Sequence, residues 1–558
     1  MVARRRVSRF TGWAAALRVA YRGPLRRAQI SFAAMWAGES AFMVALSVVA
    51  FREGGVATVG VVTAARMAAA ALLAPFLATM ADRVRRERVL ICVGVLRGAM
   101  LGCAAGVTGA GGPPAATYAF AVVATVAMAL YRPAHSALLP ALAKSPQDLT
   151  SANAVRGMLD SLGTLGGPAV AAVLLATSEP SAVFVACAAA SLVGGLVVVG
   201  LPYDAPPRAA ATRRGGREMF QGFTTIAADR ALGLITALGV VQTFTRGCLT
   251  VFAVAVAIDL LNTGDAGVGV LNAAVGAGGV LGSIFAFTLV RRGGLGTWFG
   301  VGIALFGAPL ALIGVLPDQA AALVLLGLVG VGNALIDVGG FTVLARLADE
   351  TVLARMFAGF EAILTLGIAL GALLAPLLVA VFGLRVALGI VGLVAPLAVA
   401  ASWPALRRLD ARLRVRDADI AILRGVPMLE ALPATTIEQL GAGLQHEQFA
   451  PRQVVFHQGE PGDRFYIVES GGAEVDLDGR LVRTLGPGDG FGEIALLSDE
   501  ARTATIRATP EADLRVSFLE RPAFLTAVTG YPVSAAAAQE VVGRLRARDA
   551  SRPEVDAP

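Results

Sequence analysis

The sequence predicts a polytopic α-helical membrane protein with about twelve transmembrane helices in two similar six-helix halves, followed by a soluble β-barrel or sandwich with flanking helices. Three observations support this fold class. The chain is 56% hydrophobic, whereas soluble domains are about 45–50% apolar. The composition becomes that of a soluble protein after Trp403. From Arg452 onward, short alternating runs separated by Gly-rich turns are typical of antiparallel strands.

The membrane part is predicted from the length of its apolar runs, because a spanning helix needs about 20 mostly apolar residues. We expect a basic N-terminal segment at residues 1–27, a first six-helix half at 28–201 and a second half at 231–403. The apolar runs begin near Ala28, Val56, Val89, Ala115, Asn153, Pro180, Ala231, Gly267, Leu295, Ala320, Phe357 and Leu384.

The loops predict the orientation. Arginines gather in alternate loops, and the opposite loops hold little beyond Arg52 and Arg385. Cytoplasmic loops of membrane proteins carry the excess of positive charge, so we expect both termini inside the cell, in the cytoplasmic (inner) membrane. The Arg-, Ala- and Gly-rich composition indicates a bacterial source. The net charge of +7 is dispersed over these loops, which predicts contact with a lipid bilayer and no nucleic-acid partner.

An internal repeat supports the two halves. Residues 138–168 and 343–376 both read as a loop followed by a Gly-rich helix, and they align at a constant offset of 205 positions. Between the halves, residues 202–230 form a linker rich in Pro, Gly and Arg. The matching residues are Leu139, Leu142, Ala143, Leu165 and Gly166 with Leu344, Leu347, Ala348, Leu370 and Gly371.

The stretch "ATMADRVRRERVLI" (78–91) resembles the loop signature of major facilitator transporters. Together with residues 131–154 it is most similar to the bacterial branch of siderophore and macrolide exporters, over roughly residues 25–400. The resemblance implies a secondary active transporter of a small molecule, with Asp82, Arg83 and Arg86 in a gating loop. Ala78 and Arg85 stand where the family commonly has Gly, which weakens the assignment of this gating role.

Ionisable residues inside the apolar segments mark the predicted transport path, because each costs about 2.5–3.5 kcal/mol on insertion scales and needs a partner or a water-filled cavity. For Arg97, Arg132 and Arg156 we favour a structural role at helix ends or in pairs with Asp82 or Asp160. A carboxylate in a partly desolvated cavity can carry a proton near neutral pH, as proton-coupled export requires. The transport-path candidates are Glu39, Arg66, Asp160, Arg246, Asp337 and Glu361.

A connector is expected at residues 404–424, where Leu406, Leu409 and Leu413 recur at helical spacing among arginines. It reads either as an amphipathic helix on the membrane surface or against the transporter, or as a solvated linker helix. The soluble domain is expected at residues 425–546, followed by a disordered tail at 547–558.

The stretch "FGEIALLSDEARTATIRA" (491–508) interrupts the predicted strands. Gly492 begins a short helical turn, and backbone N–H groups at such a turn hold anions. Arg502 supplies the fork of donors that suits a phosphate. Glu493 would repel a phosphate and suits a sugar hydroxyl, and Thr503 adds a hydroxyl beside Arg502. This set predicts a ribose-phosphate pocket.

The same stretch closely resembles the phosphate-binding cassette of cyclic nucleotide-binding domains, and the resemblance extends over roughly residues 420–545. It implies that Glu493 holds the ribose 2′-hydroxyl and Arg502 the cyclic phosphate, and that the backbone amides of Gly492, Ile494 and Ala495 donate hydrogen bonds to the phosphate oxygens. Ala501 stands where the family commonly has Pro. The ligand implied is cAMP, with cGMP as the alternative. The cassette residues are Phe491, Gly492, Glu493, Ile494, Ala495, Arg502 and Thr503.

Two functions follow from these patterns. The first is proton-coupled efflux of a small molecule, regulated by a cytoplasmic cyclic nucleotide. The alternative is a membrane-anchored cyclic-nucleotide receptor whose membrane domain no longer transports. The sequence contains no Walker-type loop, metal-spaced cluster or paired catalytic acid and base. We therefore expect no enzyme activity, no metal and no cofactor besides the regulatory nucleotide.

Overall fold

The computed structural model describes residues 23–81, 84–142, 146–201, 221–290, 294–347, 350–430, 432, 434–498 and 500–529. The chain divides into two compact units, Met1–Arg407 and Arg408–Pro558. Several expected segments lie wholly or partly outside the described residues: the basic N-terminal segment up to residue 22, positions 202–220 of the linker, positions 530–546 of the soluble domain, and the tail at 547–558.

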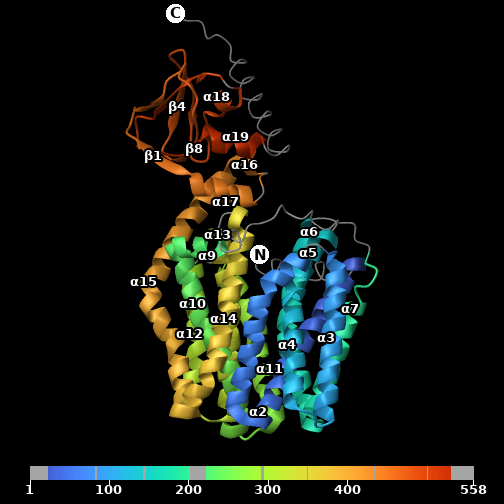
Figure 1. The fold of residues 1–558 in the computed structure, drawn as a ribbon. Coiled ribbons are helices and arrows are strands. Elements are labelled where there is room, and N and C mark those ends of the chain that lie inside the picture. The colour runs from blue at the N-terminus through green and yellow to red at the C-terminus, as the bar shows by residue number, and fades with distance from the viewer. Residues whose placement is uncertain are drawn as a thin grey trace, which may run out of the picture. The chain divides into compact units, whose positions relative to one another are not determined.

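The first unit is helical (Figure 1). Its first half contains α2 (Gly23–Ala81), α3 (Arg86–Gly109), α4 (Pro114–Ala129), α5 (Tyr131–Leu142), α6 (Pro146–Thr177) and α7 (Pro180–Leu196). The second half contains α9 (Gln221–Ala228), α10 (Arg230–Ala255), the π-helix η1 (Val256–Leu260), α11 (Gly264–Val290), α12 (Leu295–Val315), α13 (Gln319–Leu347), α14 (Glu350–Phe382) and the start of α15 (Leu384–Gly425).

The described residues include ten helices long and apolar enough to cross a membrane, and α7 adds a shorter apolar helix. The first of the ten, α2, joins two helices across a kink at Gly54 and Gly55, where Gly55 has a φ of 60°. A left-handed φ is available to glycine without steric cost, so the chain reverses there, next to the start predicted at Val56. The described residues thus contain about twelve apolar segments, which confirms the predicted fold class.

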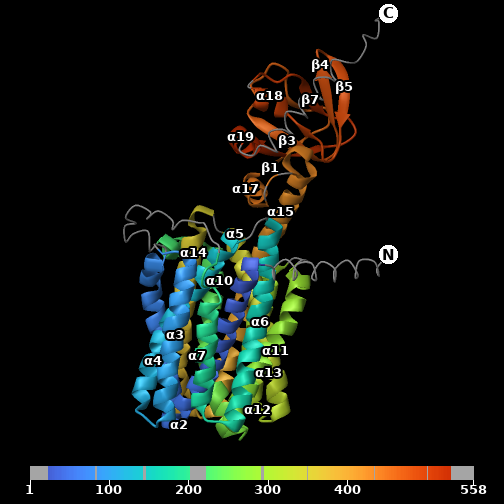
Figure 2. The same ribbon diagram turned by 90° about the vertical axis from the view of Figure 1, so that its right-hand side faces the viewer.

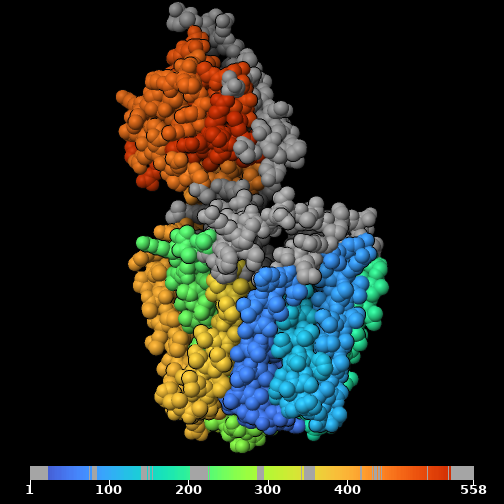
Figure 3. All heavy atoms as spheres, viewed as in Figure 1, coloured from blue at the N-terminus to red at the C-terminus, as the bar shows by residue number. Residues whose placement is uncertain are grey.

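The two halves meet along two interfaces. Each interface pairs a helix of one half with a helix of the other, and the internal repeat makes the two interfaces equivalent. Helix α2 packs against α14, and α6 packs against α11 (Figure 2). The yellow helix α14 lies beside the blue helix α2 in Figure 3. A Cβ added at Gly276 of α11 would lie 2.5 Å from the Cα of Leu165 in α6. The close approach of these helices therefore depends on glycine.

The second unit contains two four-stranded antiparallel sheets with strand orders β1-β8-β3-β6 and β2-β7-β4-β5. This arrangement confirms the predicted β-sandwich. The strands are β1 (Gln445–Phe449), β2 (Val454–Phe456), β3 (Arg464–Ser470), β4 (Ala473–Leu477), β5 (Arg480–Leu485), β6 (Gly490–Phe491), β7 (Thr505–Ala508) and β8 (Leu514–Glu520). The helices are α16 (Pro427–Glu430), α17 (Ala434–Gly443), α18 (Glu493–Ser498) and α19 (Arg521–Thr529).

The expected connector is not a separate helix. Residues 404–424 continue α15, which runs from Leu384 to Gly425 through Pro404. Leu406, Leu409 and Leu413 are buried, as their helical spacing suggested. At its end α15 contributes Leu423 to a core that includes Phe465 of β3 and Phe524 of α19. One helix therefore crosses the division between the two units.

Candidate functional site

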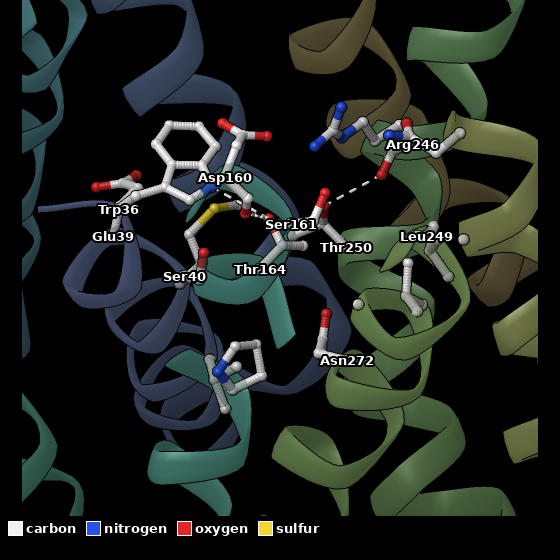
Figure 4. A pocket seen from close by; sticks show the side chains of 18 of the residues that line it. Trp36, Glu39, Ser40, Asp160, Ser161, Thr164, Arg246, Leu249, Thr250 and Asn272 are labelled. Carbon is white, nitrogen blue, oxygen red and sulfur yellow. Dashed lines mark hydrogen bonds between the residues drawn. The ribbon is translucent and has the colours of Figure 1, made fainter. Parts of the chain in front are cut away.

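The membrane unit encloses a cavity of about 410 Å³ lined by both halves (Figure 4). This volume lies in the range of sites for small molecules. Four of the six predicted transport-path residues line it, namely Glu39, Asp160, Arg246 and Asp337. Arg66 and Glu361 are not among its lining residues. Figure 4 shows Arg246 on the wall opposite Trp36 and Glu39.

Glu39 is held from behind by two buried arginines. Arg66 Nη2 lies 3.8 Å from the Glu39 carboxylate, and Arg97 forms a closer ion pair with it. Both guanidinium groups lie over the ring of Phe42, at 4.9 Å for Arg66 and 5.5 Å for Arg97. The expectation that Arg97 lies at a helix end or pairs with Asp82 or Asp160 was wrong, because it is fully buried in the middle of α3.

Asp160 is also neutralised within the first half. Its carboxylate accepts a hydrogen bond from Arg132 Nη2 at 3.1 Å, and the Arg132 guanidinium lies 4.5 Å from the ring centroid of Trp36. This is the pair that the sequence suggested as a structural clamp. Arg132 nevertheless lines the cavity, so the pair forms part of the cavity wall.

The charges of the second half are less fully paired. Asp337 accepts a hydrogen bond at 2.9 Å from the side-chain amide of Asn333, one turn earlier on α13. Within the described parts of the chain, neither Asp337 nor Arg246 has an ion-pair partner within 4.0 Å. This half of the cavity therefore exposes charges that a polar ligand can contact.

A second ion cluster joins the halves where the first and second apolar segments meet. Arg52 Nη1 lies 2.6 Å from Glu179, which precedes α7, and Arg52 Nε donates to Asp265 of α11 at 2.9 Å. The sequence analysis placed Arg52 in an outer loop and assigned it no partner. Arg52 and Asp265 belong to different halves, so their contact fastens the two halves together at this end.

The predicted gating loop is described only in part. Asp82 and Arg83 lie outside the described residues. Arg86 is the first residue of α3, and its neighbour Arg85 pairs with Glu87 at 2.5 Å.

The soluble unit places the cassette between strand β6 and strand β7. Gly492 has a φ of 87° and connects β6 to α18. A Cβ at this position would lie 2.6 Å from Arg502 Nη1 and 3.1 Å from the carbonyl oxygen of Arg464. Gly492 is therefore required both by the backbone and by the space that the arginine occupies.

Arg502 is buried, with 3% of its surface exposed, and its guanidinium points into the cassette. Nη1 donates to the carbonyl of Gly492 at 2.9 Å, and Nη2 donates to the carbonyl of Arg464 at 2.8 Å. The group lies 4.2 Å from the ring centroid of Phe456. Its Nε is buried without a hydrogen-bond partner among the described residues. A buried donor without a partner is costly, and an anionic ligand would satisfy it.

Glu493 is 2% exposed and is an electrostatic neighbour of Arg502. Burial lowers the pKa of Arg502, while Tyr466, Asp463 and Glu493 oppose that shift. The guanidinium nonetheless stays charged at physiological pH, as arginines in proteins do. The structure therefore brings the predicted acid and base to one place.

The remaining cassette residues surround this pair. Phe491 and Ala495 are buried, Ile494 is half-buried and Thr503 is exposed. The ring of Phe491 stacks on that of Tyr466, with centroids 5.1 Å apart.

The turn at residues 459–463, for which the sequence predicted only a break between strands, also supports the cassette. The backbone N–H of Gly459 donates to the carbonyl of Arg502 at 2.8 Å, and the N–H of Arg502 donates to the carbonyl of Glu460 at 2.8 Å. Asp463 lies 3.5 Å from Arg502 Nη2. The turn thus fixes the arginine on both sides of its backbone. The run "GEPGD" was the available signal.

Two regions of the chain are similar to known protein families. Residues 30–254 match the model of the Major Facilitator Superfamily, and residues 446–531 match the cyclic nucleotide-binding domain. Over 102 residues the chain is 38% identical to a cAMP-dependent protein kinase regulatory subunit from Hypocrea atroviridis. Over 118 residues it is 39% identical to the one from Yarrowia lipolytica. These matches cover 18% and 21% of this chain but only 22% and 31% of the relatives.

Among solved structures, the crystal structure of a mutant of the nucleoside transporter NupG has the same fold with a TM-score of 0.58. It is 13% identical, and the match covers 68% of this chain and 98% of the transporter. The chain therefore has the fold of a major facilitator transporter in its membrane unit, with a family match over residues 30–254, and its C-terminal unit matches the cyclic nucleotide-binding domain over residues 446–531.

Proposed function

We propose that the protein is a secondary active transporter that exports a small molecule and that cAMP bound to its C-terminal domain regulates this transport. The observation that carries the proposal is the Gly492–Glu493–Arg502 cassette, with its buried guanidinium, on the same chain as a charged cavity lined by both helical halves. The protein lies in a bacterial cytoplasmic membrane with both termini inside, where cyclic nucleotides are made. Its membrane part belongs to the branch of siderophore and macrolide exporters.

cAMP is the ligand that we favour over cGMP. The cyclic phosphate takes the Nε donor of Arg502 and the backbone N–H groups of Ile494 and Ala495, and the ribose 2′-hydroxyl donates to Glu493. The curated relatives that match this part of the chain are cAMP-dependent regulatory subunits, which supports the choice. The hydroxyl of Thr503 also suits a guanine, so both nucleotides belong in the test.

Helix α15 is the element that we propose transmits binding. Its early residues Leu388 and Val391 are buried within the membrane unit, and its late residue Leu423 lies in the core of the nucleotide unit. Regulation requires that the nucleotide binds one transport state more tightly than the other. A difference of about 1–3 kcal/mol would shift the equilibrium between the two transport states 5–150-fold.

We propose proton coupling as the energy source. The cavity is lined by the carboxylates of Glu39, Asp160 and Asp337, and a carboxylate in a desolvated site can exchange a proton near neutral pH. Dissipating an imposed proton gradient in proteoliposomes should stop export. Export that continues unchanged without any gradient would contradict proton coupling.

The regulatory role is tested in proteoliposomes with cAMP or cGMP on the cytoplasmic face. Nucleotide should alter the flux of the wild-type protein, and Arg502→Glu should abolish this response while basal flux remains. Arg480→Glu is the matched control, because Arg480 is an exposed residue of β5 outside the cassette. Flux that is the same with and without saturating nucleotide, in a protein shown to bind it, would contradict regulation.

The alternative function is a membrane-anchored cyclic-nucleotide receptor without transport. The exposed charges of Arg246 and Asp337 in the cavity argue against it. If joint neutralisation of Glu39, Asp337 and Glu361 leaves substrate resistance and efflux at wild-type levels, the receptor becomes the better description.

A further inference from the structure

The cavity is built from equivalent positions of the two halves. The offset of 205 residues that aligns the internal repeat also relates lining residues to one another, although it was found in segments outside most of the cavity wall. The related pairs in the lining are Val44 and Leu249, Met67 and Asn272, Ala70 and Val275, Thr125 and Gly330, Met128 and Asn333, Ala129 and Ala334, Arg132 and Asp337, and Asp160 and Thr365.

Two of these equivalent pairs differ in charge, Arg132 with Asp337 and Asp160 with Thr365. In the first half, Arg132 on α5 reaches Asp160 on α6 at 3.1 Å. The equivalent positions of the second half hold Asp337 on α13 and Thr365 on α14. A carboxylate and a hydroxyl thus stand where the first half has a guanidinium and a carboxylate. The cation that joins the two helices of the first half has no counterpart in the second.

The second half has no cation equivalent to Arg132. The side chains at and near the equivalent positions can accept hydrogen bonds. Asp337 keeps one carboxylate oxygen bonded to Asn333, and Asn333 and Thr365 line the same cavity. Glu361 lies one turn before Thr365 on α14 and replaces Arg156 of the first half. Glu361 and Asp160 are electrostatic neighbours of Asp337, as are Arg132 and Arg246.

The lining carboxylates differ in how closely each is paired with a cation. Its three carboxylates are Glu39, Asp160 and Asp337, against the two guanidiniums of Arg132 and Arg246. Glu39 and Asp160 are neutralised within the first half, as described above. Of the two lining cations near Asp337, Arg132 is paired with Asp160, and Arg246 forms no ion pair within 4.0 Å with any described residue. Asp337 is therefore the lining carboxylate left without a close positive partner.

We propose that the transported molecule carries a protonated amine, which binds between Asp337, Asn333 and Thr365. The ammonium group supplies to the second half the positive charge that Arg132 supplies to the first. Its three donors match the carboxylate, amide and hydroxyl oxygens on α13 and α14. This inference rests on the proposed transport function and specifies the chemical class of its substrate.

The test uses the purified full-length protein and matched probes. Tryptamine, phenethylamine and hexylamine are each compared with their N-acetyl derivatives, which keep the apolar part and lose the charge. Thermal stabilisation and quenching of tryptophan fluorescence, with Trp36 in the cavity wall, report binding. The amines should bind and the acetylated partners should bind at least tenfold more weakly, while Asp337→Asn should remove this difference.

Two variants separate the proposal from a loss of folding. Thr365→Arg places a tethered cation beside Asp337, so it should abolish amine binding while the melting temperature stays the same or rises. Thr177→Val removes an exposed hydroxyl of α6 that is not part of the cavity lining and should leave amine binding within about twofold of wild type. Equal binding of amines and acetylated probes, no binding of either, or unchanged amine binding in Thr365→Arg would overturn the proposal.

The test also distinguishes this proposal from the regulatory one. A protein whose flux responds to cAMP but that binds no amine would retain the proposed function and lose the amine site. A protein that binds amines through Asp337 but whose flux ignores cAMP would retain the site and lose the regulation.

Discussion

At the scale of single residues, the nucleotide cassette depends on what surrounds Arg502 as much as on Arg502 itself. The Gly492 carbonyl, the Arg464 carbonyl and the face of Phe456 hold the guanidinium in place before any ligand arrives. Such pre-positioning lowers the entropy cost of binding. Substitutions next to the arginine should therefore affect nucleotide affinity without removing any group that contacts the nucleotide.

Gly492→Ala tests this dependence. The added methyl group would meet Arg502 Nη1 at 2.6 Å on a backbone with a φ of 87°, a conformation that costs a non-glycine residue of order 1–3 kcal/mol. We expect cAMP affinity to fall at least tenfold and the nucleotide unit to melt several degrees lower. Gly479→Ala in the exposed β4–β5 turn also has a positive φ, 81°, but open space around it. It should cost stability without a comparable loss of affinity.

Glu469 should make the stability of the nucleotide unit depend on pH. Burial alone would raise the pKa of Glu469, but hydrogen bonds from Ser517 and His446, the latter at 2.5 Å, lower it below its usual value. A carboxylate with a lowered folded-state pKa stabilises the fold above its unfolded pKa, and this stabilisation is lost as the pH falls through the folded value.

We therefore expect the midpoint of urea unfolding of the nucleotide unit, measured in the full-length protein, to drop as the pH falls below about 4.5. Glu469→Gln should flatten this dependence and lower the midpoint at neutral pH. Glu474 on the neighbouring sheet provides the matched control as Glu474→Gln. Parallel pH curves for wild type and Glu469→Gln would contradict the prediction.

At the scale of elements, α15 departs most from the sequence-based expectation. The composition changes at Trp403, and residues 404–424 were expected to form a connector helix, either amphipathic against the membrane or the transporter, or solvated. The structure instead continues the last membrane helix to Gly425. Local propensity could not reveal this continuity, because the burial of Leu409 and Leu413 depends on tertiary packing.

The proposed transmission through α15 predicts a specific loss. Replacing the exposed Arg412 and Arg414 together by glycine should weaken the helix by about 2 kcal/mol. Nucleotide affinity should remain within about threefold of wild type, while the effect of nucleotide on flux should largely disappear. The matched alanine pair removes the same charges and keeps the helix, so it should retain regulation. Equal regulation in both variants would exclude helical continuity as the transmitting feature.

The sequence was most informative where chemistry is local. The cassette was predicted residue by residue, because Gly492, Glu493 and Arg502 lie within a short stretch. Hydropathy likewise predicted the apolar segments, since length alone decides whether they can span. Neither the local motifs nor the hydropathy predicted that Arg97 would pair with Glu39, because the depth of a residue in the membrane does not tell which way its side chain faces. Partners far apart in sequence, such as Arg52 and Asp265, were missed for the same reason.

At the scale of the whole membrane unit, the halves are fastened at one end by Arg52 and carry exposed charges in the cavity between them. Arg52 bonds Asp265 of the other half and Glu179 of its own. Transport by alternating access requires the halves to separate at each end in turn. The Arg52 cluster therefore stabilises the state that is closed at this end.

Arg52→Ala should shift the protein toward the state open at that end. We expect a cysteine placed at Val268, which is buried in the cavity wall on α11, to react at least fivefold faster with a membrane-impermeant maleimide added outside intact cells. The exposed Cys92 and Cys103 must first be replaced by serine. Arg385→Ala removes the other arginine that the loop charges predict to lie outside, and it serves as the control. Unchanged labelling in Arg52→Ala would show that the cluster does not hold this end closed.

Because equivalent positions of the two halves carry different charges, the two walls of the cavity are not equivalent. In a cavity between two identical halves of this kind, the two facing walls would be equivalent. Once one half has Arg132 and Asp160 and the other has Asp337 and Thr365, a molecule with an amine at one end has a single favoured orientation in the cavity. The duplicated halves can then no longer exchange roles, and the cavity distinguishes the head of its substrate from the tail.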